Sequence, residues 1–123
     1  MKLHVNDDKT LNLFTSYGES FIEVNKVRYH SNLLVQPQHL LPEWTTADFA
    51  NLCEADFQRL AELGTEILLL GTGSRLRFPQ GVLLRPIANA GIGLEVMDVG
   101  AACRTYNILA NEGRNVTAAL LLA

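Results

Sequence analysis

The chain has 123 residues, 48% of them hydrophobic, and its 13 acidic and 10 basic residues give a net charge of −3. A chain of this length can bury roughly two thirds of its unfolded surface, so we expect one domain over residues 1–123 that needs no stabilising disulfide or metal. The acidic balance, without a long run of like charge, argues against a nucleic-acid-binding protein that neutralises phosphates.

The N-terminus and the cysteines indicate an expected location. The first ten residues, MKLHVNDDKT, lack the apolar segment of a signal peptide, and no apolar run approaches the ~18 residues of a membrane span. Cys53 and Cys103 form no CxxC pair, which favours a reducing compartment and suggests no cysteine-based zinc site. We therefore expect a cytoplasmic protein without a membrane span, metal or cofactor.

The N-terminal third is predicted to be β-structure. Its expected strands lie at 11–16, 20–24, 26–30 and 32–37. The second and third meet at Asn25 and Lys26, a spacing that predicts a two-residue hairpin turn although glycine is absent. Pro37 and Pro42 bracket a segment predicted to be irregular. Trp44 is expected in the core, because large aromatic residues in small domains are usually well buried.

Three helices are predicted in the rest of the chain. The first covers about 53–63 and stops at Gly64, which supplies a left-handed end. The second contains Pro86, so its regular part is expected to begin near Leu83 and to end at 89–91. The third begins after Asp98, its expected N-cap, and ends at Gly113.

Two apolar runs around a glycine-rich loop predict the fold class. Residues 67–70 are continuously apolar, as expected for a strand covered on both faces, and 94–97 are similar except for Glu95. We expect Glu95 to face solvent or to pair with a basic residue. Roughly 20 residues separate the runs, enough for the crossover between parallel strands. With 116–121 as a final strand, the pattern predicts an α/β fold with βαβ units and an N-terminal β-hairpin region.

The loop GTGSR is a candidate anion pocket. Its residues are Gly71, Thr72, Gly73, Ser74 and Arg75. Backbone N–H groups in a glycine-rich turn can bind an anion, Ser74 adds a hydroxyl and Arg75 adds a positive charge. The loop lacks the third glycine of a dinucleotide-binding fingerprint and the lysine of a Walker motif. The alternative is that Gly71 and Gly73 only allow a sharp turn with positive φ.

A second candidate site lies on the third predicted helix. At ~100° per residue its polar residues form a narrow stripe expected to face solvent or a partner. The stripe consists of Cys103, Arg104, Asn107 and Asn111. Because cysteine and asparagine are weak helix formers with no evident local benefit there, we predict a partner surface bordered by Arg75. The alternative is an ordinary solvated helix face.

Catalysis by Cys103 is a competing hypothesis. A cysteine near a helix N-terminus and beside Arg104 can acquire a lowered pKa. A nucleophile also needs a positioned base, and the chain's three histidines form no spaced signature with Cys103. We therefore assign no catalytic residue. An enzyme or an anion-binding protein that uses the GTG loop and Cys103 remains the alternative.

Two long runs, EILLLGTGSRLRFP and GIGLEVMDVGAACRTYNILANEGRNVTAALL, resemble a known family of small α/β domains. This is the family of the mitochondrial NADH:ubiquinone oxidoreductase (complex I) assembly factor 3 and its uncharacterised bacterial relatives. The signature is GTG at 71–73 with ACRTYN at 102–107 and EGR at 112–114, and the run YGESFIEVNKVRYHSNLLVQP agrees more loosely. The resemblance implies a three-layer fold whose mixed central sheet has one strand antiparallel to the others.

For function, the resemblance implies a non-enzymatic assembly factor that binds other proteins, which for the mitochondrial relative happens at the inner membrane. The chain shows no mitochondrial targeting segment, so we expect a bacterial protein. The expectation is a protein-binding or assembly-factor-like module in respiratory-complex or membrane-protein biogenesis. Its expected partner is another protein and not a nucleic acid.

Overall fold

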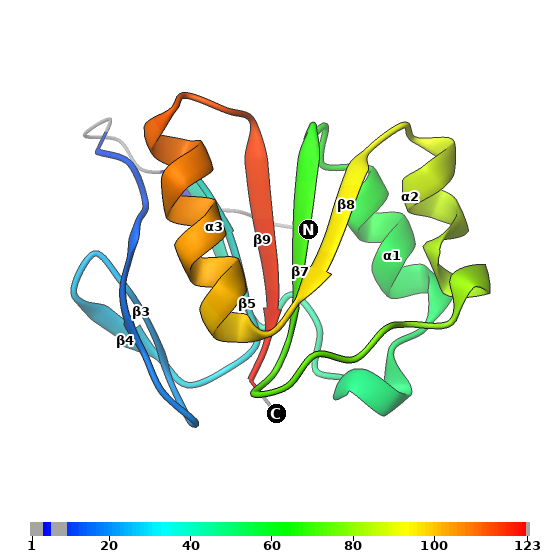
Figure 1. Cartoon of the computed structure of the whole chain (residues 1–123), viewed down its shortest axis with the longest axis horizontal. Coiled ribbons are helices and arrows are strands. Elements are labelled where there is room, and N and C mark those ends of the chain that lie inside the picture. The colour runs from blue at the N-terminus through cyan, green and yellow to red at the C-terminus, as the bar shows by residue number, and fades with distance from the viewer. Residues whose placement is uncertain (1–3, 6–9, 123) are drawn as a thin grey trace.

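A mixed six-stranded sheet forms the centre of the computed structural model, which describes residues 4–5 and 10–122 (Figure 1). The strands lie in the order β1-β6-β5-β9-β7-β8. They span His4–Val5 (β1), Leu33–Gln36 (β5), His39–Pro42 (β6), Ile67–Thr72 (β7), Gly93–Met97 (β8) and Val116–Leu121 (β9). Strands β6, β9, β7 and β8 run in one direction, and β5 and the short β1 run in the other. The expected mixed sheet is confirmed, with β1 as a second reversed strand.

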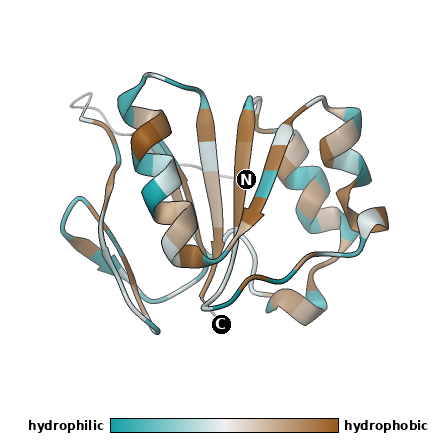
Figure 2. Ribbon diagram, viewed as in Figure 1, coloured by the Kyte–Doolittle hydropathy of each residue, from teal (hydrophilic) through white to brown (hydrophobic). Residues whose placement is uncertain are grey.

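The molecule has three layers, of which the central sheet is the middle one, and each face of this sheet packs into its own hydrophobic core. Helix α3 (Val99–Asn111) and a small antiparallel sheet cover one face, while α1 (Glu54–Ala61) and α2 (Arg85–Asn89) cover the other. Figure 2 shows the hydrophobic residues concentrated in the central strands between these layers. In β7, Leu69 belongs to the core under α3, and Leu68 and Leu70 belong to the core under α1 and α2. The prediction of a strand covered on both faces is therefore confirmed.

The chain order of these elements gives two parallel crossovers. Strands β7 and β8 are adjacent and parallel, with Ile67 opposite Gly93, and α2 lies in the connection between them. Helix α3 then returns the chain over the opposite face, so that β9 joins the other side of β7. Parallel strands joined through helices are the pattern of βαβ units, and this arrangement confirms the predicted α/β fold class.

The small sheet contains β2 (Phe14–Tyr17), β3 (Ile22–Val24) and β4 (Val27–Tyr29). Its β3–β4 turn is formed by Asn25 and Lys26, as predicted, with φ angles of 48° and 70°. Both values suit the two-residue turn that follows the twist of a hairpin. Asn25 stabilises its conformation through its side chain, which accepts a hydrogen bond from the N–H of Leu13 and donates one to the carbonyl of Leu11. These bonds explain how the turn forms without glycine.

The helix ends follow local capping chemistry. Asp98 caps α3 by accepting a hydrogen bond from the N–H of Ala101 at 2.9 Å, and Gly113 follows the helix with a φ of 77°. A 3₁₀ helix, Gly81–Leu84 (η2), precedes α2, whose first turn holds Pro86 where no N–H donor is needed. A second 3₁₀ helix, Phe49–Asn51 (η1), precedes α1. Within the described residues, no helix has both the length and the hydrophobicity needed to cross a membrane.

The prediction of an irregular segment between Pro37 and Pro42 is wrong. The segment contains β6, which pairs with β5 through a tight turn that brings Gln36 opposite His39. Pro37 lies in this turn and Pro42 ends the strand, so neither interrupts the ladder. The buried side chain of Asn12 stabilises the hairpin, because its Nδ2 donates hydrogen bonds to the carbonyls of Gln36 and His39, both at 3.0 Å. Trp44 is buried after β6, as predicted, and donates to the carbonyl of Leu120 at 3.0 Å.

Candidate functional site

A pocket of about 310 Å³ opens where four separate segments meet. These are the end of β2 with the turn that follows it, the loop that follows β7, the first turns of α3, and Leu122 just after β9. The polar and apolar side chains that line it include Tyr17, Glu19, Ser74, Asp98, Arg104 and Leu122. The topology thus brings part of the predicted anion loop and part of the predicted helix stripe to one pocket.

Tyr17 and α3 form the wall of the pocket on the side of the small sheet. A Cβ atom on Gly100 would lie only 2.9 Å from Cε2 of Tyr17, so glycine allows the aromatic ring to approach the start of the helix. One turn later, Nη1 of Arg104 donates a hydrogen bond to the Tyr17 hydroxyl. Both side chains reach solvent, and together they make an exposed polar rim on a fixed backbone.

The charges around the pocket do not favour an anion. Two carboxylates, Glu19 and Asp98, line it together with a single guanidinium group, that of Arg104. The N-terminus of α3 faces the pocket, but the Asp98 carboxylate already accepts a hydrogen bond from the first turn. An incoming anion would compete with this carboxylate for the positive end of the helix dipole. The pocket is better suited to a basic or neutral polar group.

Two residues of the predicted anion loop have structural roles in the core. A Cβ atom on Gly71 would lie 2.6 Å from Cδ2 of Leu120, so glycine permits β7 to pack closely at this point. Thr72 is fully buried, and its hydroxyl donates to the carbonyl of Arg75 at 2.8 Å and accepts from the N–H of Arg77 at 3.0 Å. The Thr72 hydroxyl therefore shapes the loop and does not line the pocket.

The other three residues of the loop, Gly73, Ser74 and Arg75, differ in whether they line the pocket. Gly73 has a φ of 92°, which confirms the predicted positive value, and its carbonyl accepts a hydrogen bond from the N–H of Val99 at 2.9 Å. Gly73 and Ser74 line the pocket, whereas the exposed Arg75 lies outside this lining. Arg77 places its guanidinium carbon 4.6 Å from the centre of the Phe49 ring. Neither Arg75 nor Arg77 is therefore among the residues that line the pocket.

Cys103 is buried, contrary to the expected solvent-facing stripe. The small sheet covers this side of α3, and a helical projection contains no information about that layer. Burial raises the pKa of the Cys103 thiol to about 12, against a smaller lowering effect of the Arg104 charge. The thiol is therefore protonated at neutral pH, which does not favour a nucleophilic role.

Asn107 joins α3 to the small sheet. Its side-chain oxygen accepts a hydrogen bond from the N–H of Phe14 at 2.9 Å, and its side-chain nitrogen donates to the carbonyl of Phe14 at 2.8 Å. The amide group thus pairs with the strand backbone as a neighbouring strand would. Arg104 and Asn111 are exposed. The structure therefore splits the predicted stripe into two residues packed toward the small sheet and two that face solvent.

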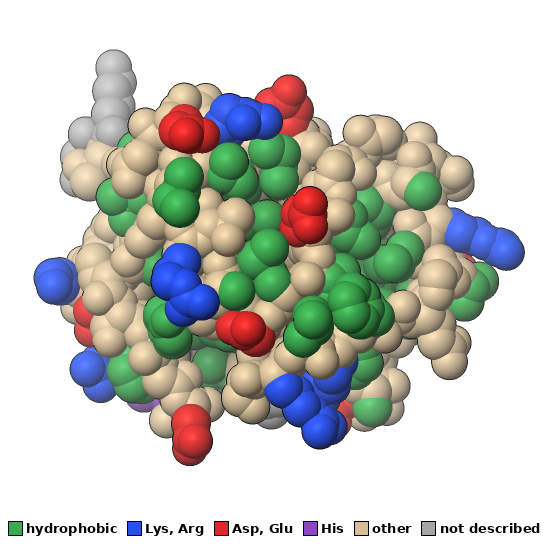
Figure 3. All heavy atoms as spheres, in the orientation of Figure 1, with side chains coloured by type: hydrophobic (Ala, Val, Ile, Leu, Met, Phe, Trp, Pro, Cys, Tyr) green, Lys and Arg blue, Asp and Glu red, His purple; other side chains and the backbone are tan. Residues whose placement is uncertain are grey.

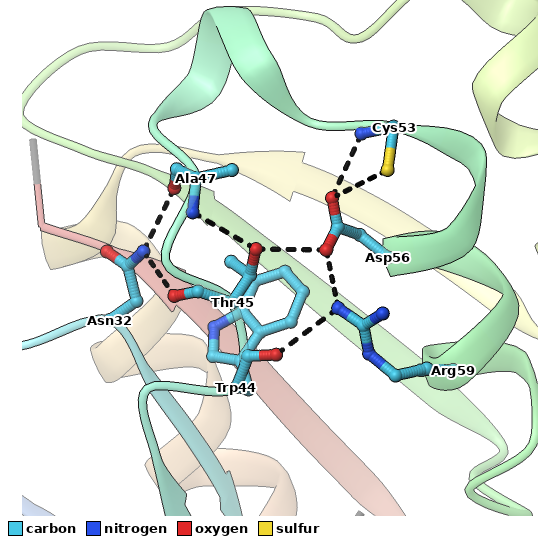
Figure 4. Close-up of polar contacts among 7 residues, drawn as sticks. All are labelled: Asn32, Trp44, Thr45, Ala47, Cys53, Asp56 and Arg59. Carbon is cyan, nitrogen blue, oxygen red and sulfur yellow. Dashed lines mark hydrogen bonds and ion pairs between the residues drawn. The ribbon is translucent and has the colours of Figure 1, made fainter.

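A polar cluster around Asp56 lies on the opposite side of the molecule's central sheet (Figure 4). Asp56 is only 5% exposed, and it accepts hydrogen bonds from the N–H of Cys53 at 2.9 Å and from the hydroxyl of Thr45 at 2.9 Å. Arg59 also donates to its carboxylate. Burial alone would raise the pKa of Asp56, but these hydrogen bonds lower the pKa overall.

This cluster fastens α1 to the segment that follows β6. Asp56 is the third residue of α1 and accepts a hydrogen bond from the N–H of the N-cap residue Cys53, as in a capping box, although Cys-x-x-Asp is not the usual sequence signature of that motif. The contact with Thr45 joins residues of different segments and has no local sequence signal. In the described part of the chain, no group of three or more His, Cys, Asp and Glu side chains is placed to hold a metal ion.

The fold and the pocket place the chain among small three-layer α/β proteins built on a mixed sheet. Residues 14–121 match the family described as "Protein of unknown function (DUF498/DUF598)", and the chain belongs to this family. Its relatives include human NADH dehydrogenase (ubiquinone) 1 alpha subcomplex assembly factor 3, at 35% identity over 75% of this chain and 53% of that protein. The resemblance expected from the sequence is confirmed.

Bacterial relatives match over a larger share of their length. The 13 kDa major membrane protein of Francisella tularensis is 28% identical over 88% of this chain and 89% of that protein. By contrast, the chain spans 58% and 53% of the bovine and human assembly factors.

Solved structures share the fold. A crystal structure from Bordetella parapertussis superposes with a TM-score of 0.83 at 41% identity, covering 91% of this chain and 96% of that one. A solution structure from Bordetella pertussis, described as a Mth938-like domain, has a TM-score of 0.78 at 36% identity, with coverage of 98% and 92%.

Proposed function

We propose that this chain is a non-enzymatic protein-binding module of the assembly-factor kind. The observation that carries the proposal is its kinship with proteins named as assembly factors, because assembly requires binding to other proteins. The finer proposal is a role in respiratory-complex or membrane-protein biogenesis, in the cytoplasm of a bacterium, by one domain that binds no nucleic acid.

The partner surface is the rim of the pocket at the start of α3. Tyr17 is 41% exposed, and the exposed Arg104 contacts its hydroxyl. Tyrosine and arginine are enriched in protein interfaces, where they combine apolar contact area with hydrogen-bond donors. The neighbouring carboxylates of Glu19 and Asp98 favour a partner segment that presents a basic or amide side chain. The exposed Arg75, next in sequence to Ser74, is proposed to border this surface.

The test is charge reversal at the rim, with a matched arginine elsewhere as control. Arg104→Glu changes an exposed side chain at the pocket, and Arg85→Glu makes the same change on the exposed part of α2. Neither variant is expected to lose more than about 0.5 kcal/mol of unfolding free energy. In affinity purification from the native organism, Arg104→Glu should lower recovery of the specific partner protein at least about tenfold, while Arg85→Glu retains it.

Two results would contradict the assigned surface. One is full recovery of the partner with Arg104→Glu, and the other is an equal loss with both variants. If Arg104→Glu fails to fold, Ser74→Arg tests the same pocket from the exposed loop.

A further inference from the structure

Strand β8 leaves one edge of the central sheet open. It is the last strand of the sheet and pairs with β7 alone among the strands described. In Figure 1, β8 lies at the front between α3 and α2, and neither helix is drawn across it. Its residues are exposed or half-buried, whereas every residue of β9 and all of β7 except Ile67 are buried.

The register determines which backbone groups of β8 point outward. The N–H of Gly93 donates to the carbonyl of Glu66 in the segment before β7, at 2.9 Å. Glu95 and Met97 follow at every second position of β8, so their backbone groups also point toward β7. Because backbone groups alternate direction along a parallel strand, the N–H and C=O groups of Leu94 and Val96 point away from β7. For these outward groups, the described residues supply no hydrogen-bond partner. They form a template for one more strand.

A groove of about 360 Å³ runs beside this edge, between β8 and α3. Its apolar lining includes Ile67, Leu69 and Leu109, and Gly93 also lies along it. Glu95 and Arg114 supply the charged groups. Figure 3 shows hydrophobic side chains gathered over the middle of this face. A strand added to β8 would place alternate side chains over this groove.

The charge of Glu95 argues against a second copy of this chain as the added strand. In an antiparallel pair of β8 strands from two copies, each copy contributes the outward backbone groups of Leu94 and Val96. If all of these groups form hydrogen bonds across the pair, Leu94 of one copy lies opposite Val96 of the other. Glu95 would then lie directly opposite its counterpart, about 4.5 Å away between Cα atoms. Like charges directly opposite each other destabilise a strand pair. A strand with lysine or arginine at that position would instead gain a favourable cross-strand pair.

We propose that β8 binds an extended segment of another protein as an additional strand. The segment places an apolar side chain in the groove beside α3 and a lysine or arginine next to Glu95. This mode of recognition takes its affinity from backbone hydrogen bonds and its specificity from alternate side chains. The surface shares no lining residue with the pocket of Tyr17 and Arg104, so it goes beyond the proposed function.

The experiment selects nine-residue peptides from a displayed random library on the purified protein. The dissociation constants of the selected synthetic peptides are then measured by fluorescence anisotropy. We expect alternating apolar residues with a lysine or arginine at one position. Val96→Pro removes an outward N–H that β7 does not use, and Val96→Ala is the control that keeps this N–H. Binding should weaken at least about tenfold with proline and change by less than about threefold with alanine.

Two further variants complete the test. Glu95→Lys should reverse the charge preference of the selected peptides, and Arg104→Glu should leave their affinity unchanged, which separates this edge from the pocket. The proposal is wrong if selection yields no alternating peptide or if Val96→Pro binds as well as Val96→Ala. It is also wrong if the wild type is a dimer that Val96→Pro dissociates, because the edge would then accept a second copy. Should Val96→Pro not fold, an unchanged peptide preference in Glu95→Lys refutes the proposal.

Discussion

Replacing Asn107 by alanine tests the connection between α3 and the small sheet. The change removes two hydrogen bonds to the backbone of Phe14, at 2.9 and 2.8 Å. Each such bond contributes about 0.5–1.5 kcal/mol net, so the variant loses about 1–3 kcal/mol. The higher helix propensity of alanine returns about 0.6 kcal/mol. Asn111→Ala on the same helix is the matched control, because its exposed side chain has the same propensity change without these bonds.

The two variants should therefore differ by about 1–3 kcal/mol in unfolding free energy. For a chain of 123 residues this corresponds to a gap of roughly 4–12 °C between their melting temperatures. Urea unfolding can be followed by the fluorescence of Trp44, the single tryptophan, which is 3% exposed. Equal midpoints for the two variants would refute a structural role of Asn107 and would restore it to the partner surface.

Three further predictions follow from the described contacts. Gly73→Val should lower the unfolding free energy by about 1–3 kcal/mol, because a φ of 92° strains a branched residue; an unchanged urea midpoint would contradict this. The hydrogen bonds of Asp56 hold its folded pKa below the ordinary value of 3.8, so their stabilisation is present above about pH 4 and lost as pH falls through the lowered pKa. Asp56→Asn should accordingly be destabilised at pH 7, and its deficit should shrink in acid unfolding series below about pH 4. A thiol reagent should modify the exposed Cys53 in the native protein and reach the buried Cys103 only in denaturant, whereas rapid native reaction of both would contradict the burial.

The parts of the fold that could be predicted from the sequence depend on local signals. Strand β7 carries an unbroken apolar run, which is the pattern of a strand covered on both faces. Asp98 and Gly113 mark the two ends of α3 through capping and a left-handed residue, both of which act within a few positions. The hairpin turn at Asn25 and Lys26 likewise depends on its spacing between two strand patterns.

The parts that could not be predicted depend on residues far apart in the chain. Strand β6 is stabilised by pairing with β5 and by Asn12, whose contacts join the N-terminal segment to the hairpin. The exposure of Cys103 depends on whether the small sheet packs on that side of α3. At the pocket, proximity between Ser74 and Arg104 follows from the crossover geometry, and the orientation of Arg77 toward Phe49 follows from tertiary packing. None of these tertiary contacts produces a repeating pattern of residues in the sequence from which it could have been predicted.

The most direct measurement of the proposed protein-binding role is site-specific photo-crosslinking in living cells of the native organism. A photoreactive amino acid replaces Ser74 at the pocket, and in a second strain it replaces Val82, which is 46% exposed on η2 and outside the pocket lining. One specific crosslinked protein is expected from position 74, with no such product from position 82. Arg104→Glu is expected to remove the crosslink. A crosslink that is absent at position 74, or equally strong at position 82, would contradict the proposed partner surface.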